Sequence, residues 1–183
     1  MILKTKLFGH VYEFKSIREV MAKANEEKSG DKLAGIAAET AEERVAAKVV
    51  LSNLTLNDLR NCPAVPYEED EVTRIIQDSV NETIFNEYKN MTVAEFREWL
   101  LDTQTTPDMI RRASRGLTSE IVAGVCKLMS NLDLIYAAKK MRVTAHCNTT
   151  IGLPGTFSSR LQPNHTTNDP NGIVASVMEG LSL

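Results

Sequence analysis

The sequence predicts a mainly α-helical protein whose last part begins a β/α unit. Three segments place a glutamate three positions after a serine or threonine, at Ser16–Glu19, Thr40–Glu43 and Thr92–Glu95. This spacing is the capping box that starts a helix. From Asn148 onward apolar and polar residues alternate instead, as they do in a strand. We therefore expect a helical N-terminal region over residues 1–147 and the start of a second domain over residues 148–183.

The first helices follow from their caps and stop residues. Residues 7–14 alternate weakly, which indicates a short strand or an extended arm. We expect a helix from Ser16 to about Lys28, ended by Ser29-Gly30, and a second helix from Thr40. The side chains expected on the buried side of the second helix are Val45, Val49 and Leu51.

Later helix boundaries are also marked. The acidic run Glu68–Glu71 complements a helix N-terminus, although it can also be interpreted as a site for a cation or a basic partner. Thr106-Pro107 places a proline at the first helical position, and Thr118 precedes an apolar helix that carries Cys126 in its predicted core. Thr55 is expected to be a cap, as is Thr92. Arginines that complement a helix end are Arg111, Arg112 and Arg115.

Composition excludes several classes of function. A net charge of -3 offers no basic surface for nucleic acid or an anionic membrane, and no apolar run is long enough to span a bilayer or to form a signal peptide. Cys62, Cys126 and Cys147 lack a paired spacing, which indicates reduced thiols in the cytoplasm. His146 and Cys147 are adjacent without a third ligand nearby in sequence, so we expect no metal site.

The candidate site lies in the strand predicted between Asn148 and Asn164. Side chains alternate between the two faces of a strand, so an apolar face and a polar face result. The polar face ends in Arg160 and Gln162, which can hydrogen-bond a small polar ligand, and Pro163 then ends the strand. The alternative interpretation is that Arg160 is a solvated charge at a strand end. The apolar face holds Ile151, Leu153, Phe157 and Leu161, and the polar face also holds Thr156 and Ser158.

The same segment carries a specific resemblance. The run NTTIGLPGTFSSRLQPN closely resembles the heavy (large) chain of ethanolamine ammonia-lyase, and so do SGDKLAG, ERVAAK, IIQDSVNET, RGLTSE and SNLDLIYAAKKM. The heavy chain of that family carries a (β/α)8 TIM barrel that binds adenosylcobalamin and ethanolamine. The resemblance implies that Arg160, Leu161 and Gln162 bind the substrate, and that Arg160 also acts in catalysis.

The resemblance also implies an activity and its partners. The intact enzyme converts ethanolamine to acetaldehyde and ammonia by a radical 1,2-migration and elimination, and adenosylcobalamin is the source of the deoxyadenosyl radical. The implied partners are the small (light) chain and other heavy chains in an oligomer. The implied location is the cytoplasm, within a bacterial microcompartment.

Length limits how much of such a barrel the chain can hold. A complete barrel takes about 250 residues, and this one would begin only near Thr150. We therefore expect the first βα unit of a truncated TIM barrel, with Glu179-Gly180 stopping its helix before another strand. Most of the cobalamin site is expected outside the chain, none of its residues is assigned to the cofactor, and the chain alone is expected to be inactive.

Charge suggests roles for the two polar residues. Ethanolamine carries an ammonium and a hydroxyl, so the guanidinium of Arg160 should donate to the hydroxyl oxygen and stabilise negative charge there. The carbonyl of Gln162 can accept from the ammonium. The competing hypothesis is that the chain is a non-catalytic helical module through which lyase subunits assemble.

Overall fold

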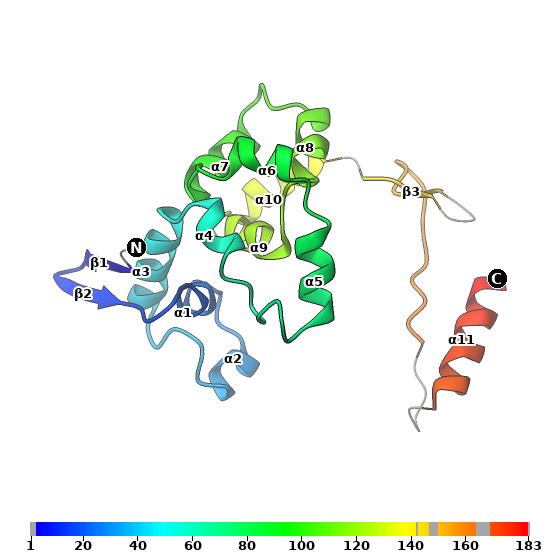
Figure 1. Cartoon of the computed structure of the whole chain (residues 1–183), viewed down its shortest axis with the longest axis horizontal. Helices are drawn as coiled ribbons and strands as arrows, with labels where there is room; N and C mark the ends of the chain where they lie inside the picture. The colour runs from blue at the N-terminus through cyan, green and yellow to red at the C-terminus, as the bar shows by residue number, and fades with distance from the viewer. Residues whose placement is uncertain (1–2, 142, 147–149, 164–168, 183) are drawn as a thin grey trace. The chain divides into compact units, whose positions relative to one another are not determined.

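The computed structural model describes residues 3–141, 143–146, 150–163 and 169–182. The chain divides into two compact units, Met1–Met141 and Arg142–Leu183 (Figure 1). The boundary predicted between residues 147 and 148 lies outside the described residues, so that division stays a prediction. The expectation of a mainly helical protein is confirmed.

The first unit opens with a β-hairpin and continues as helices. Strand β1 (Lys4–Leu7) pairs antiparallel with β2 (His10–Glu13), with Lys4 opposite Glu13. The helices that follow are α1 (Ile17–Lys23), α2 (Ser29–Leu33), α3 (Ala41–Ser52), α4 (Leu56–Arg60), α5 (Glu71–Asp78), α6 (Glu82–Tyr88), α7 (Val93–Leu101), α8 (Pro107–Ser114), α9 (Ser119–Lys127) and α10 (Asn131–Lys140).

Most predicted helix starts are confirmed at the atomic level. Ser16, Thr40 and Thr92 each accept a hydrogen bond from the backbone N–H three residues ahead. Asp70 does the same at the start of α5, which supports the helix-start interpretation of the acidic run. Thr106 caps α8 with Pro107 at its first position. Thr118 occupies the N-cap position of α9 without forming a side-chain cap, and its buried hydroxyl has no hydrogen-bond partner among the described residues.

Three expectations about the helices are wrong. The first helix ends at Lys23, and Ser29-Gly30 begins α2, because these small residues and Asp31 form an acceptable first helical turn. Val45 is 43% exposed, since α3 buries the face formed by Ala46, Ala47, Val50 and Leu51. Cys126 is exposed for the same geometric reason. The face that α9 buries holds Ile121, Gly124 and Val125.

Two helix–turn–helix pairs meet through matching turns. Residues 53–60, NLTLNDLR, resemble residues 90–97, NMTVAEFR. Thr55 and Thr92 form an antiparallel bridge at the two turns. Leu56 N donates to Met91 O at 3.0 Å, and Val93 N donates to Leu54 O at 2.8 Å. Each threonine caps its own helix in a full capping box. The backbone groups that the turns would leave unsatisfied therefore bond to each other.

The core of the first unit lies where these turns meet α9. Leu51, Leu56, Leu59 and Ile121 are fully buried. A Cβ at Gly124 would lie 2.7 Å from Leu59 Cδ1, so α9 approaches α4 closely only because residue 124 is glycine. Close packing of this kind makes the core sensitive to added volume.

Removal of the Thr92 cap should destabilise the first unit. Thr92→Ala deletes the hydroxyl that satisfies Glu95 N. We expect the free energy of unfolding to fall by about 1 kcal/mol, measured by urea denaturation followed by circular dichroism. Thr83→Ala is the matched control, because Thr83 is exposed inside α6. Equal losses in both variants would show that the cap does not stabilise the fold.

Ion pairs to arginine should make stability depend on pH. Hydrogen bonds from arginine hold the pKa of three carboxyl groups below the usual range. The pairs are Arg60 with Glu82, Arg112 with Glu87, and Arg97 with Asp133. A lowered folded-state pKa stabilises the fold above the unfolded-state pKa, and this contribution is lost as the pH falls through the folded-state pKa.

We therefore expect the urea midpoint to fall on going from pH 7 toward about pH 3. The variant Glu87→Gln removes one of these contributions and should flatten the profile in that range. A midpoint that rises on acidification would contradict the assignment of these pKa directions.

The second unit is small. Strand β3 (Ala145–His146) pairs antiparallel with β4 (Thr150–Ile151), and helix α11 (Pro170–Ser182) follows. No helix in the described ranges is long and apolar enough to cross a bilayer. The two-residue strands neither form nor exclude a TIM barrel, which stays a prediction.

Candidate functional site

The predicted strand of the second unit is mostly irregular backbone. Only Thr150–Ile151 is strand, and the segment from Thr156 to Pro163 has no regular secondary structure. Its predicted apolar face is exposed, and Phe157 is 101% exposed. The reason is that an extended segment needs neighbouring strands for its N–H and C=O groups. Apart from the β3–β4 pair, the described residues of this unit provide none.

A tight turn interrupts the alternation of apolar and polar residues. Thr156 N donates to Leu153 O at 3.2 Å across Pro154 and Gly155, and Gly155 has a φ of +75°. Proline followed by glycine with positive φ is the arrangement of a type II turn. Gly152 also has positive φ, and a Cβ there would lie 2.2 Å from Val143 O. The predicted alternation therefore does not run through this turn.

Arg160 and Gln162 meet on one side of the segment. Arg160 Nη2 donates a hydrogen bond to Gln162 Oε1. Both side chains are otherwise exposed. Residues two apart project in the same direction in an extended chain, and the hydrogen bond agrees with that placement of Arg160 and Gln162. The structure thus brings together the two polar residues of the predicted site.

Leu161 packs against helix α11. A Cβ built on Gly180 would lie 2.5 Å from Leu161 Cδ2 and 2.6 Å from Cδ1. Leu161 can therefore approach the helix this closely only because residue 180 has no side chain. The contact attaches the segment that carries Arg160 and Gln162 to a helix. Leu161 was predicted to bind substrate, and that prediction stays untested.

Helix α11 starts at a clear cap and continues past its expected end. Asp169 accepts hydrogen bonds from Asn171 N at 3.2 Å and Gly172 N at 3.1 Å, and Pro170 is the first helical residue. The expectation that Glu179-Gly180 stops the helix is wrong, since α11 extends to Ser182. Gly180 instead serves as the contact point for Leu161.

Metal ligands do not converge near this segment. Within the described ranges, no group of three or more His, Cys, Asp or Glu side chains is placed to hold an ion. His146 Nδ1 lies 2.7 Å from Thr150 Oγ1, a contact that ties β3 to β4. Cys147, considered beside His146, lies outside the described residues.

Comparison with known proteins assigns the chain to a family. Residues 12–183 match the family model of the ethanolamine ammonia lyase large subunit (EutB). The chain belongs to this large-subunit family. It is 58% identical over all 183 residues to the ethanolamine ammonia-lyase large subunits of Escherichia coli K12 and Salmonella typhimurium LT2. The chain spans 40% of the length of these relatives.

Two features of the segment that carries Arg160 and Gln162 were not predicted from the sequence. Pro154-Gly155 is a recognised turn signal, and it should have limited the alternation to the residues after it. The Leu161–Gly180 contact has a weaker signal, a glycine inside an apolar helical pattern. Such a glycine can mark close packing, yet the sequence does not say which side chain approaches it.

Proposed function

We propose that the chain forms part of the substrate site of an ethanolamine ammonia-lyase. The complete reaction converts ethanolamine to acetaldehyde and ammonia by a radical 1,2-migration and elimination. Two observations support the proposal: the family match, and the Arg160–Gln162 pair, which places a cationic donor beside a neutral acceptor. The pair is the observation that carries the proposal, because ethanolamine has a hydroxyl oxygen that can accept from Arg160 and an ammonium that can donate to Gln162.

The hydrogen bond between the two residues indicates how substrate would enter. Arg160 Nη2 donates a hydrogen bond to Gln162 Oε1, and this oxygen is the one proposed to accept from the substrate ammonium. Ethanolamine would replace this bond with two others. Its ammonium donates to Gln162 Oε1, and its hydroxyl oxygen accepts from the released guanidinium. The bond that is lost and the two that replace it are all charge-assisted, so the replacement gains one hydrogen bond of this kind.

Arg160 would then act electrostatically. The guanidinium remains protonated at any physiological pH, so it cannot take up the substrate proton. A cationic donor fixed beside the hydroxyl oxygen stabilises negative charge that develops there during migration of the amino group. Leu161 would hold the donor in position through its contact with Gly180, and substrate contact by Leu161 would be through its backbone.

The proposed cofactor is adenosylcobalamin, which supplies the radical when bound. We assign none of the described side chains to it. An acidic partner for the ammonium is likewise expected from the region that the relatives have in addition. The role of this chain is thus confined to binding and orienting ethanolamine.

An assembly role is favoured by exposed apolar side chains. Val174, Met178 and Leu181 form a stripe along α11, and each is more than half exposed. Leu132 and Ile135 form a second exposed pair on α10. Exposed apolar patches of this kind mark protein contacts. We propose that they contact the lyase small chain or other large chains, in an oligomer within a cytoplasmic microcompartment.

A chimeric enzyme tests the proposal. This chain replaces the stretch it matches in the Escherichia coli large subunit, which is combined with the small chain and adenosylcobalamin. We expect acetaldehyde formation from ethanolamine, coupled to alcohol dehydrogenase, within about tenfold of the parent, since 58% of the exchanged residues are identical. A folded, assembled chimera without turnover would contradict the proposal.

Gln162→Ala in this chimera should mainly weaken substrate binding. It removes one charge-assisted hydrogen bond to the ammonium, so KM for ethanolamine should rise by about tenfold or more, with a smaller change in kcat. Steady-state kinetics over a range of ethanolamine concentrations measures both. An unchanged KM would make Gln162 a structural residue at the end of the segment.

A further inference from the structure

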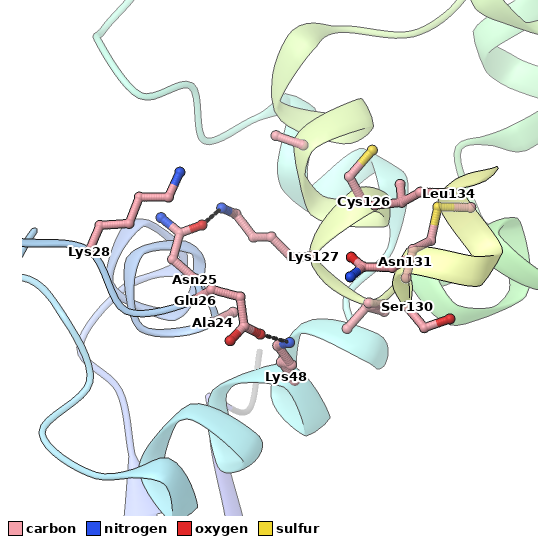
Figure 2. A pocket seen from close by; sticks show the side chains of 13 residues that line it. Ala24, Asn25, Glu26, Lys28, Lys48, Cys126, Lys127, Ser130, Asn131 and Leu134 are labelled. Atoms are coloured by element: carbon pink, nitrogen blue, oxygen red, sulfur yellow. Dashed lines mark hydrogen bonds and ion pairs between the residues drawn. The ribbon is translucent and has the colours of Figure 1, made fainter. Parts of the chain in front are cut away.

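A lysine-lined cleft lies in the first unit and shares no lining residue with the segment that carries Arg160 and Gln162. It has a volume of about 900 Å³. Its walls come from the C-terminal ends of α1 and α9, from α3, and from the start of α10. Lys28, Lys48 and Lys127 line it, and Glu26 is the carboxylate among its lining residues (Figure 2). The lining therefore contains three lysines and one glutamate, in a chain whose net charge is -3.

The pairing within the cleft leaves positive charge uncompensated. Lys48 Nζ binds Glu26 Oε1 at 2.9 Å, and Arg44 Nε approaches Glu26 Oε2 at 3.8 Å. Lys127 Nζ donates to the neutral side-chain oxygen of Asn25 (Figure 2). Across the described ranges, no carboxylate lies within ion-pair distance of Lys28 or Lys127. Lys28 and Lys127 therefore line the cleft without an ion-pair partner among the described residues, and the nearest charge attraction on Lys127 is the longer-range one of Asp31.

The environment of Lys127 adds to this imbalance. The side chain is half-buried, and burial lowers the pKa of its ammonium. Among the nearby charges, Asp31 acts most strongly and raises that pKa, Lys28 and Lys48 lower it by repulsion, and Cys126 raises it. A cation withdrawn from water and facing like charges is stabilised when an anion binds beside it.

We propose that this cleft binds a phosphate-bearing small organic molecule. Its lining cations are lysines, which bind phosphate groups as point charges. Its volume exceeds that of a single phosphate and lies in the range of small-molecule pockets, about 300–1,000 Å³. Leu128, Met129 and Leu134 supply apolar wall for an organic part.

Calorimetric titration of the 183-residue chain with pyrophosphate tests the site. We expect saturable binding that the double variant Lys28→Gln/Lys127→Gln weakens by about tenfold or more, because each lysine contributes a charge-assisted contact. Lys139→Gln is the matched control, since Lys139 is an exposed lysine of α10 outside the cleft. Titrations with sodium chloride at matched ionic strength measure non-specific screening.

A local readout places the ligand. Cys126 lines the cleft and Cys62 does not, so pyrophosphate should slow alkylation of Cys126 by iodoacetate, as measured by mass spectrometry, and leave Cys62 unaffected. Absence of pyrophosphate binding, or equal binding by the double variant, would overturn the proposal. Citrate that binds as tightly as pyrophosphate would overturn the assignment to phosphate.

Discussion

Arg160→Ala in the chimeric large subunit should reduce kcat for ethanolamine by about 10²–10³-fold. Removing one preorganised donor to a developing negative charge costs this much in other enzymes. The guanidinium is the group that we place on the substrate hydroxyl oxygen, and its present partner is Gln162 Oε1. The coupled acetaldehyde assay measures the loss.

Two further variants make this result specific. Ser159→Ala should retain the activity of the parent chimera, because Ser159 is exposed and is not part of the Arg160–Gln162 pair. Arg160→Lys should recover only part of the loss, since an ammonium keeps the charge without the fixed fork of donors. Full activity in the alanine variant would remove Arg160 from the site.

Gly180→Leu should also reduce turnover, through a residue that does not contact the substrate. A Cβ at this position would lie 2.5 Å from Leu161 Cδ2, so a leucine must displace Leu161 and the segment that carries Arg160 and Gln162. A displacement of about 1 Å near a reacting group can cost about 10²-fold in rate. We therefore expect kcat/KM to fall by up to about 10²-fold, measured in the same assay.

Restoring the packing should restore the rate. The double variant Leu161→Ala/Gly180→Leu exchanges the large and small residues across the contact and should regain most of the lost kcat/KM. Ala175→Leu is the control, because Ala175 is exposed on the same helix. If Arg160 matters but the double variant is no better than Gly180→Leu, the packing contact does not position the site.

The helical part of the fold could be predicted because its signals are local. A hydroxyl residue followed by a glutamate or aspartate three positions later satisfies N–H groups within a few residues, so Thr40, Thr55 and Thr92 identify helix starts without knowledge of the rest of the fold. Which side chains are buried depends less on the local sequence than helix starts do. Val45 and Cys126 have apolar neighbours in sequence but are exposed, because other elements contact the adjacent face of each helix.

The candidate site could be predicted only in part. Two-residue periodicity was sufficient to place Arg160 and Gln162 on one side of the chain, where they form a hydrogen bond. It was not sufficient to predict the turn at Pro154-Gly155 or the exposure of Phe157, because an extended segment is a strand only when other strands pair with it. The Leu161–Gly180 contact depends on two residues that lie far apart in sequence and meet only in three dimensions.

A crystal structure of the chimera with bound ethanolamine would test the central claim most directly. We predict that the Arg160–Gln162 hydrogen bond is replaced by two contacts to the substrate, each at about 2.7–3.2 Å. One joins a guanidinium nitrogen of Arg160 to the hydroxyl oxygen, and the other joins Gln162 Oε1 to the ammonium. Ethanolamine bound elsewhere, with Arg160 still donating to Gln162, would contradict the account.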